Sequence, residues 1–152
     1  MRRRDREISD RAAIEAIIAG AEVCRLGLCD DGRPYVVPMS FGYRDGTVYF
    51  HSASSGRKID ILKVNPQVCV EWDVNEGLVR SEVACECSMR YRSVIGFGTV
   101  RFLEAPEDKA RALDIIMANY SGGTHEYAEA SLTATAVFAV ELAEVSGKQS
   151  GM

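Results

Sequence analysis

Residues 47–66, TVYFHSASSGRKIDILKVNP, bring together an imidazole, several hydroxyls and two adjacent bases. A β-type apolar run ends at His51, and a segment rich in serine and glycine then leads to Arg57 and Lys58. From Arg57 the apolar spacing predicts a short helix that stops before Pro66. A helix start leaves backbone N–H groups unpaired and carries partial positive charge, to which the two bases add full charges. This pattern predicts a phosphate-binding turn, with a tight loop and two solvated bases as the alternative.

Other chemistry has few candidates in this chain. The sequence contains no Gly-x-Ser-x-Gly elbow, no Walker loop and no dinucleotide-binding glycine motif. Only His51 and His125 offer an imidazole, and a lone histidine is more often structural than catalytic. His51 is of interest because it lies beside the proposed phosphate turn. If the protein catalyses a reaction, we expect a bound cofactor to carry it.

The cysteines favour neither disulfides nor a metal. There are five of them, an odd number, with no secretion signal. Cys85 and Cys87 are two apart, which in a strand is poor geometry for a mutual disulfide. A single Cys-x-Cys pair is also a weak zinc signal. We therefore expect no metal site and expect the cysteines to be buried as small hydrophobes.

Length and composition predict one domain over residues 1–152, with residues 1–7 as a flexible tail. The chain is 47% hydrophobic, which supports one sizeable core, and its formal net charge is −4. The acidic balance argues against nucleic acid as a partner. The basic N-terminal cluster has no apolar segment after it and is not a signal peptide, and no run reaches the ~18 apolar residues of a membrane span. A cytoplasmic location is the expectation.

Strand signals dominate the chain. Tight turns at Asp31-Gly32 and around Asp45-Gly46 predict hairpins. Pro38, inside the second predicted strand, requires an edge, a bulge or an interrupted ladder. We predict a mainly β fold, a small antiparallel barrel of six strands with helices packed outside. The strands are expected at 23–29, 35–43, 47–53, 68–74, 91–102 and 133–145, and the main helices at 8–20, after residue 57 and after residue 106.

Two glycines share one face of the strand at 91–102. Gly96 and Gly98 leave a bare patch that a flat ring or another backbone can approach. A sharp bend of the barrel explains the same spacing equally well. Both explanations stay open at this stage.

Three segments carry a family resemblance: PYVVPMSFGY (34–43), VYFHSASSGRKIDIL (48–62) and MRYRSVIGFGTVRFL (89–103). Together they resemble the pyridoxamine 5′-phosphate oxidase-related flavoproteins, and most closely the nitroimidazole-resistance (Nim-like) branch. The resemblance covers roughly residues 8–148. It implies a homodimeric split β-barrel that binds FMN at the subunit interface.

The resemblance also implies roles for individual residues. It assigns the FMN phosphate to Arg57 and Lys58. It places the flavin ring along the strand at 36–40 and beside the strand end at His51 and Ser52. It further implies that Ser93 is a polar side chain contributed by the other subunit and that His51 lies near the flavin. The residues implied to contact the cofactor are Pro38, Met39, Ser40, His51, Ser52, Arg57, Lys58 and Ser93.

The departures from the family pattern bear on the substrate. Phe41 stands where the pyridoxamine oxidases have a lysine for the substrate phosphate, and their C-terminal tryptophan and arginine have no counterpart here. The resemblance therefore implies an FMN-dependent oxidoreductase that reduces a small electron-poor acceptor, such as a nitroimidazole, with His51 positioning or protonating it. The alternative is a flavin- or haem-binding module without turnover, in which His51 is an axial ligand.

Overall fold

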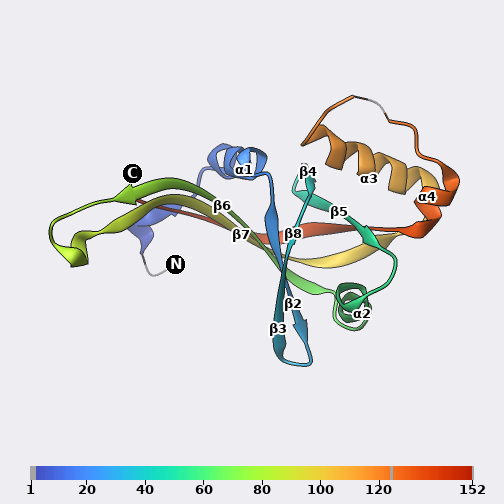
Figure 1. The fold of residues 1–152 in the computed structure, drawn as a ribbon, viewed down its shortest axis with the longest axis horizontal. Helices are drawn as coiled ribbons and strands as arrows, with labels where there is room; N and C mark the ends of the chain where they lie inside the picture. Colours follow the sequence, from blue (N-terminus) through green and yellow to red (C-terminus); the bar gives the residue numbers. More distant parts are fainter. Residues whose placement is uncertain (1–2, 124, 152) are drawn as a thin grey trace.

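The computed structural model describes residues 3–123 and 125–151. Within these residues the strands form one antiparallel sheet in the order β3-β2-β6-β7-β8-β5-β4, with β1 paired to β8. β3 and β4 end this path, yet only two residues separate them in the chain. The two edges of the sheet therefore lie close together and the sheet curls into a split barrel (Figure 1). The strands are β1 Glu7–Ile8, β2 Cys24–Asp30, β3 Arg33–Met39, β4 Gly42–Arg44, β5 Thr47–Ala53, β6 Gln67–Val79, β7 Ser88–Leu103 and β8 Thr135–Ser150.

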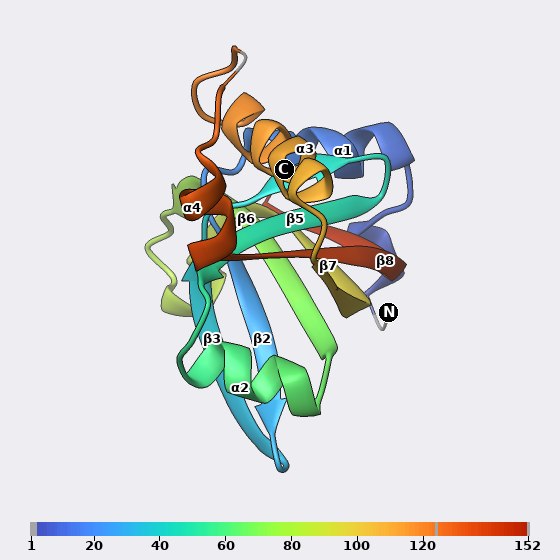
Figure 2. The same cartoon turned by 90° about the vertical axis from the view of Figure 1, so that its right-hand side faces the viewer.

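Helices cover the outside of the barrel. They are α1 Arg11–Gly20, α2 Arg57–Val64, α3 Pro106–Ala118 and α4 Glu129–Ala134, with 3₁₀ turns at Arg4–Arg6 and Ala84–Glu86. Figure 2 shows α2 beside β2 and β3, at the opposite end of the molecule from α1 and α3. None of the described helices has the length and apolar character needed to cross a membrane.

The prediction of a mainly β, antiparallel barrel is confirmed, but the predicted count of six strands is wrong. The described residues form eight, because the strand expected at 35–43 breaks into β3 and β4 and because β1 pairs with β8. The break has a long-range cause. The Phe41 backbone N–H donates to the Tyr120 hydroxyl at 2.9 Å, which in turn donates to the Glu22 carbonyl at 2.8 Å. Within the N-terminal segment, Arg4–Arg6 form a 3₁₀ turn, and Glu7 and Ile8 pair with β8.

The placement of Pro38 agrees with its chemistry. It lies in β3, the edge strand of the sheet, opposite Arg25 of β2. A proline has no backbone N–H to donate to a ladder, and an edge strand does not need one on its outer side.

The close approach at the two glycines comes from β8. An added Cβ at Gly98 would lie 2.3 Å from the Glu141 carbonyl oxygen, at the bulge where the β7–β8 register shifts. At Gly96 the same atom would meet the flexible end of the Leu142 side chain at 2.9 Å. Backbone packing at a barrel bulge therefore accounts for Gly98, and no flat ring is needed.

The expectation that all five cysteines are buried is wrong for Cys85 and Cys87. Ala84–Glu86 form a 3₁₀ turn between β6 and β7, and both thiols are exposed. Cys24 is fully buried, and burial raises the pKa of its thiol to about 12.

We expect Cys85 and Cys87 to be the first cysteines to react with a thiol reagent at about pH 8, because both side chains are accessible. Cys24 should react only after unfolding, since it is both buried and protonated at that pH. Mass spectrometry of peptides after a timed reaction with iodoacetamide measures the order. Early modification of Cys24 would contradict the described core.

Candidate functional site

An open groove of about 460 Å³ lies where β3, β5 and the start of α2 meet. It gathers seven of the eight residues implied to contact a cofactor, although they come from three separate elements. The lining residues among them are Pro38, Met39, Ser40, His51, Ser52, Arg57 and Lys58. The groove forms at the end of β3, at Met39, because the last residues of β5 and the turn before α2 lie beside it.

The start of α2 has the form predicted for an anion site. Gly56 occupies the N-cap with φ 118°, a conformation open to glycine, and no side chain caps the helix. The first backbone N–H to bond inside the helix is that of Asp60, to the Gly56 carbonyl at 3.0 Å. The preceding N–H groups thus lack intrahelical acceptors and, with the helix dipole, attract negative charge.

Arg57 is held in place by two neighbours. Its guanidinium carbon lies 4.6 Å from the centre of the Tyr35 ring, and its Nη2 lies 3.4 Å from Asp30 Oδ2. Both partners come from the β2–β3 hairpin. The side chain of Arg57 is half exposed, so an anion in the groove can reach its remaining N–H groups.

Lys58 points toward the end of β3. Its Nζ donates to the Met39 sulfur at 3.1 Å, a weak acceptor that leaves its other N–H groups available. Partial burial lowers the pKa of Lys58. A nearby anion would favour the charged form again, because opposite charges stabilise each other.

His51 and Ser52 occupy the end of β5. The His51 side chain is exposed, and in the described part of the chain no hydrogen bond to its imidazole forms. The Ser52 hydroxyl donates to the Ala53 carbonyl at 2.9 Å. An imidazole that is exposed at a groove wall can contact a bound molecule without first giving up a protein partner.

Ser93 lies outside the groove of its own chain. It is on β7, opposite Asp73 of β6 and Lys148 of β8. Side chains of Ser93, Ile95 and Phe97 alternate with buried Val94, so these three face outward together. Within one chain, Ser93 is therefore not part of the groove lining.

Two residues of the site were missed by the sequence reasoning. Tyr35 lines the groove and carries the ring beneath Arg57, and Asp30 pairs with the same guanidinium. Both flank the Asp31-Gly32 turn, but nothing in the local sequence indicates that this hairpin folds against α2. For a metal ion, the described residues hold no cluster of three or more ligating side chains.

Residues 10–149 match the family model described as pyridoxamine 5′-phosphate oxidase. The chain belongs to this family. Among solved structures, a candidate 5-nitroimidazole antibiotic resistance protein of Bacteroides thetaiotaomicron is 39% identical, with a TM-score of 0.87 over 94% of this chain and 86% of that one. The resemblance to the pyridoxamine oxidase-related proteins and to the Nim-like branch is thereby confirmed.

Solved structures of lower sequence identity have the same fold. The flavocytochrome Anf3 of Azotobacter vinelandii is 24% identical, with a TM-score of 0.89 over 100% of this chain and 72% of that one. An FAD- and haem-binding protein of Mycobacterium smegmatis is 22% identical, with a TM-score of 0.89 over 97% and 74% of the two chains. A curated uncharacterized protein of Rhizobium meliloti is 30% identical over 64 residues, which is 42% of either chain.

The groove fits what a mononucleotide flavin requires. Its phosphate end offers an uncapped helix start and two cations. Its wall offers Pro38 and Met39, apolar side chains on a strand whose outer edge leaves backbone groups unpaired. Features that suit a phosphate and features that suit an apolar ring therefore occur in one groove.

Proposed function

We propose that this protein binds FMN in the groove between β3, β5 and α2 and uses it to reduce a small electron-poor acceptor, of which nitroimidazoles and other nitroaromatic compounds are the class to test. The observation that carries the proposal is the convergence of Arg57, Lys58 and the uncapped start of α2 on one groove. Phosphate binding by helix N-termini with adjacent cations is common among proteins.

In this proposal, the position of each groove residue sets its role. Arg57 and Lys58 hold the phosphate, with Tyr35 and Asp30 keeping Arg57 oriented. Pro38, Met39 and Ser40 face the ring. Bound FMN supplies the redox chemistry, taking electrons from a donor and passing them to the acceptor. His51, at the end of β5, positions or protonates the acceptor.

The functional unit in this proposal is a homodimer with FMN at the interface. The outer face of the sheet supports it. Val36, Ile95 and Phe97 are 61%, 38% and 49% exposed, and they lie on one face. Cross-strand register aligns Val36, Gly27, Cys69 and Phe97 in one row, next to the row that holds Pro38 and Ile95. Exposed apolar faces of this kind mark interaction sites, and pairing through it would bring the partner's Ser93 toward the groove.

The first experiment is the absorbance spectrum and sedimentation velocity of the purified protein, with any chromophore released by heat and identified by mass. Flavin bands, FMN near one per chain and a dimeric sedimentation coefficient are the expected results. Failure to take up added FMN by a folded protein would overturn the proposal.

We expect His51→Ala to keep FMN but to reduce nitro compounds more slowly, by roughly 10²-fold if His51 donates a proton in the rate-limiting step. Stopped-flow oxidation of the reduced protein by metronidazole measures this rate. His125→Ala is the matched control, because His125 lies outside the groove and its ring bonds to the Gly122 carbonyl in its own loop. An unchanged rate in His51→Ala would remove His51 from the mechanism.

The second candidate is a flavin- or haem-binding module without turnover. It is favoured by the exposed His51, whose imidazole is available as an axial ligand. A Soret band in place of flavin bands, lost in His51→Ala, would select this candidate.

A further inference from the structure

The two residues between β3 and β4, Ser40 and Phe41, link the groove to the core. Ser40 is exposed and lines the groove, whereas the side chain of Phe41 is fully buried. The Phe41 ring packs edge-on against Trp72, with the ring centres 5.8 Å apart. Whatever fixes this short segment therefore fixes one wall of the groove as well.

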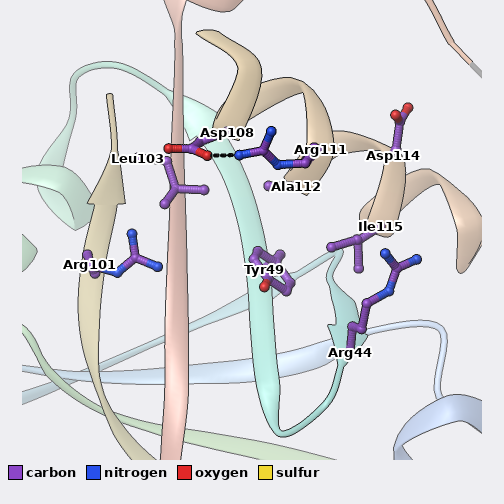
Figure 3. Close-up of a pocket in the computed structure, with 9 residues that line it drawn as sticks. All are labelled: Arg44, Tyr49, Arg101, Leu103, Asp108, Arg111, Ala112, Asp114 and Ile115. Atoms are coloured by element: carbon purple, nitrogen blue, oxygen red, sulfur yellow. Dashed lines mark hydrogen bonds and ion pairs between the residues drawn. The ribbon is translucent and has the colours of Figure 1, made fainter. Parts of the chain in front are cut away.

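α3 holds the segment from outside the barrel. The Phe41 backbone N–H donates at 2.9 Å to the hydroxyl of Tyr120, which lies just beyond the end of α3. At Gly42, the first residue of β4, an added Cβ would lie 2.7 Å from the Ile115 carbonyl oxygen. The backbones of β4 and α3 are thus in direct contact, and Figure 3 shows Ile115 beside the strand that carries Arg44. The segment cannot shift unless the helix shifts with it.

The Tyr120 hydroxyl is itself fixed in place and in role. It donates to the Glu22 carbonyl at 2.8 Å, and since a hydroxyl has one proton, the Phe41 N–H must meet a lone pair of its oxygen. On the backbone, the N–H groups of Tyr120 and Ser121 both donate to the Met117 carbonyl, at 3.0 and 2.8 Å. One hydroxyl therefore joins the end of α3, the connection between α1 and β2, and the segment at the groove.

The direction of the Phe41 N–H also sets the direction of the Ser40 carbonyl. The described residues contain no cis peptide bond, and in a planar trans peptide the N–H and the preceding C=O point to opposite sides. With the N–H held toward Tyr120, the Ser40 carbonyl points away from it. No backbone N–H of residues 3–123 and 125–151 donates to this carbonyl. Ser40 lines the groove and Tyr120 does not, so the segment presents an unpaired acceptor of fixed direction at the groove wall.

We infer that Tyr120 is a positioning residue for the flavin ring. Through the Phe41 N–H it holds the Ser40 carbonyl toward the groove, where this carbonyl accepts a hydrogen bond from the N3–H of the flavin. That N–H is the single donor on the pyrimidine edge of an oxidised flavin, between two carbonyl oxygens, so it needs an acceptor of matching direction. Tyr120 itself does not touch the flavin. The inference rests on the proposed flavin binding.

The test compares FMN with FMN methylated at N3, which keeps the phosphate and the ring but lacks the N3–H. Tyr120→Phe removes the hydroxyl and keeps the aromatic side chain. We expect it to weaken FMN binding roughly threefold to tenfold, the value of one neutral hydrogen bond, and to leave the affinity for N3-methyl-FMN unchanged. Titrations followed by flavin fluorescence measure each dissociation constant. General damage to the fold would weaken both ligands alike, so the ratio of the two constants reports the carbonyl contact.

Tyr127→Phe is the matched control. It removes another tyrosine hydroxyl from the connection between α3 and α4, one that donates to Asp114 of α3 at 2.9 Å, and it should alter neither constant. Hydrogen exchange of the Phe41 amide, measured without flavin, should be faster in Tyr120→Phe because that amide loses its acceptor.

An unchanged FMN affinity in Tyr120→Phe, or an equal loss of FMN and N3-methyl-FMN, would overturn the inference. So would equal binding of the two flavins by the unaltered protein, a result that needs no variant to fold. These results would leave the proposed function standing. Failure of the unaltered protein to take up FMN would overturn both.

Discussion

We expect the double variant Arg57→Gln, Lys58→Gln to bind FMN roughly 10²- to 10⁴-fold more weakly than the unaltered protein, because each charge-assisted hydrogen bond contributes about 1.5–3 kcal/mol. The two side chains line the same end of the groove, next to the uncapped start of α2. Fluorescence quenching of FMN on titration with protein measures the dissociation constant. The helix start remains in the variant, so some phosphate affinity should persist.

Two controls separate phosphate binding from general damage. Lys63→Gln changes a base in the last turn of the same helix and should leave the FMN affinity unaltered. Riboflavin has the ring without the phosphate, so the double variant should bind it as the unaltered protein does. An equal loss for riboflavin and FMN would show that the two bases act on the ring or on the fold instead.

The second large effect concerns the barrel itself. Gly98→Ala should lower the free energy of unfolding by about 3 kcal/mol, at the upper end of the usual cost of overpacking. The added methyl group would lie 2.3 Å from the Glu141 carbonyl oxygen and 2.7 Å from a Val140 methyl group. Backbone atoms of a paired strand cannot withdraw as a side chain can, so the β7–β8 bulge must shift.

Gly96→Ala is the matched control on the same face of β7. Its methyl group would meet only the end of the Leu142 side chain, which can change rotamer, so a cost of about 1 kcal/mol is expected. Urea unfolding at one fixed protein concentration measures both values, because the stability of the proposed dimer would depend on concentration. If the two variants lose the same stability, the bulge is more adaptable than the close contact implies.

Where the signals are local, the sequence by itself determined the secondary structure around the groove. The strand at 47–53 and a helix that begins at Arg57 and stops before Pro66 were predicted, and the structure has β5 at Thr47–Ala53 and α2 at Arg57–Val64. Glycine before a helix and proline after it restrict backbone angles within one or two residues, so no distant partner is needed to interpret them. The Asp31-Gly32 and Asp45-Gly46 turns were predicted for the same reason, and both have the expected positive φ angles.

Tertiary structure decided whatever depends on partners far away in the chain. The strand breaks at Phe41 because the hydroxyl of Tyr120, 79 residues later, accepts a hydrogen bond from the Phe41 backbone N–H. Asp30, 27 residues before Arg57, helps to orient that guanidinium. Tyr49 of β5 lies in one hollow with residues of β4, β7 and α3. Apolar periodicity indicates which face of one element is buried, but it carries no information on which elements pack together. The packing of the elements against one another decides which of these side chains meet.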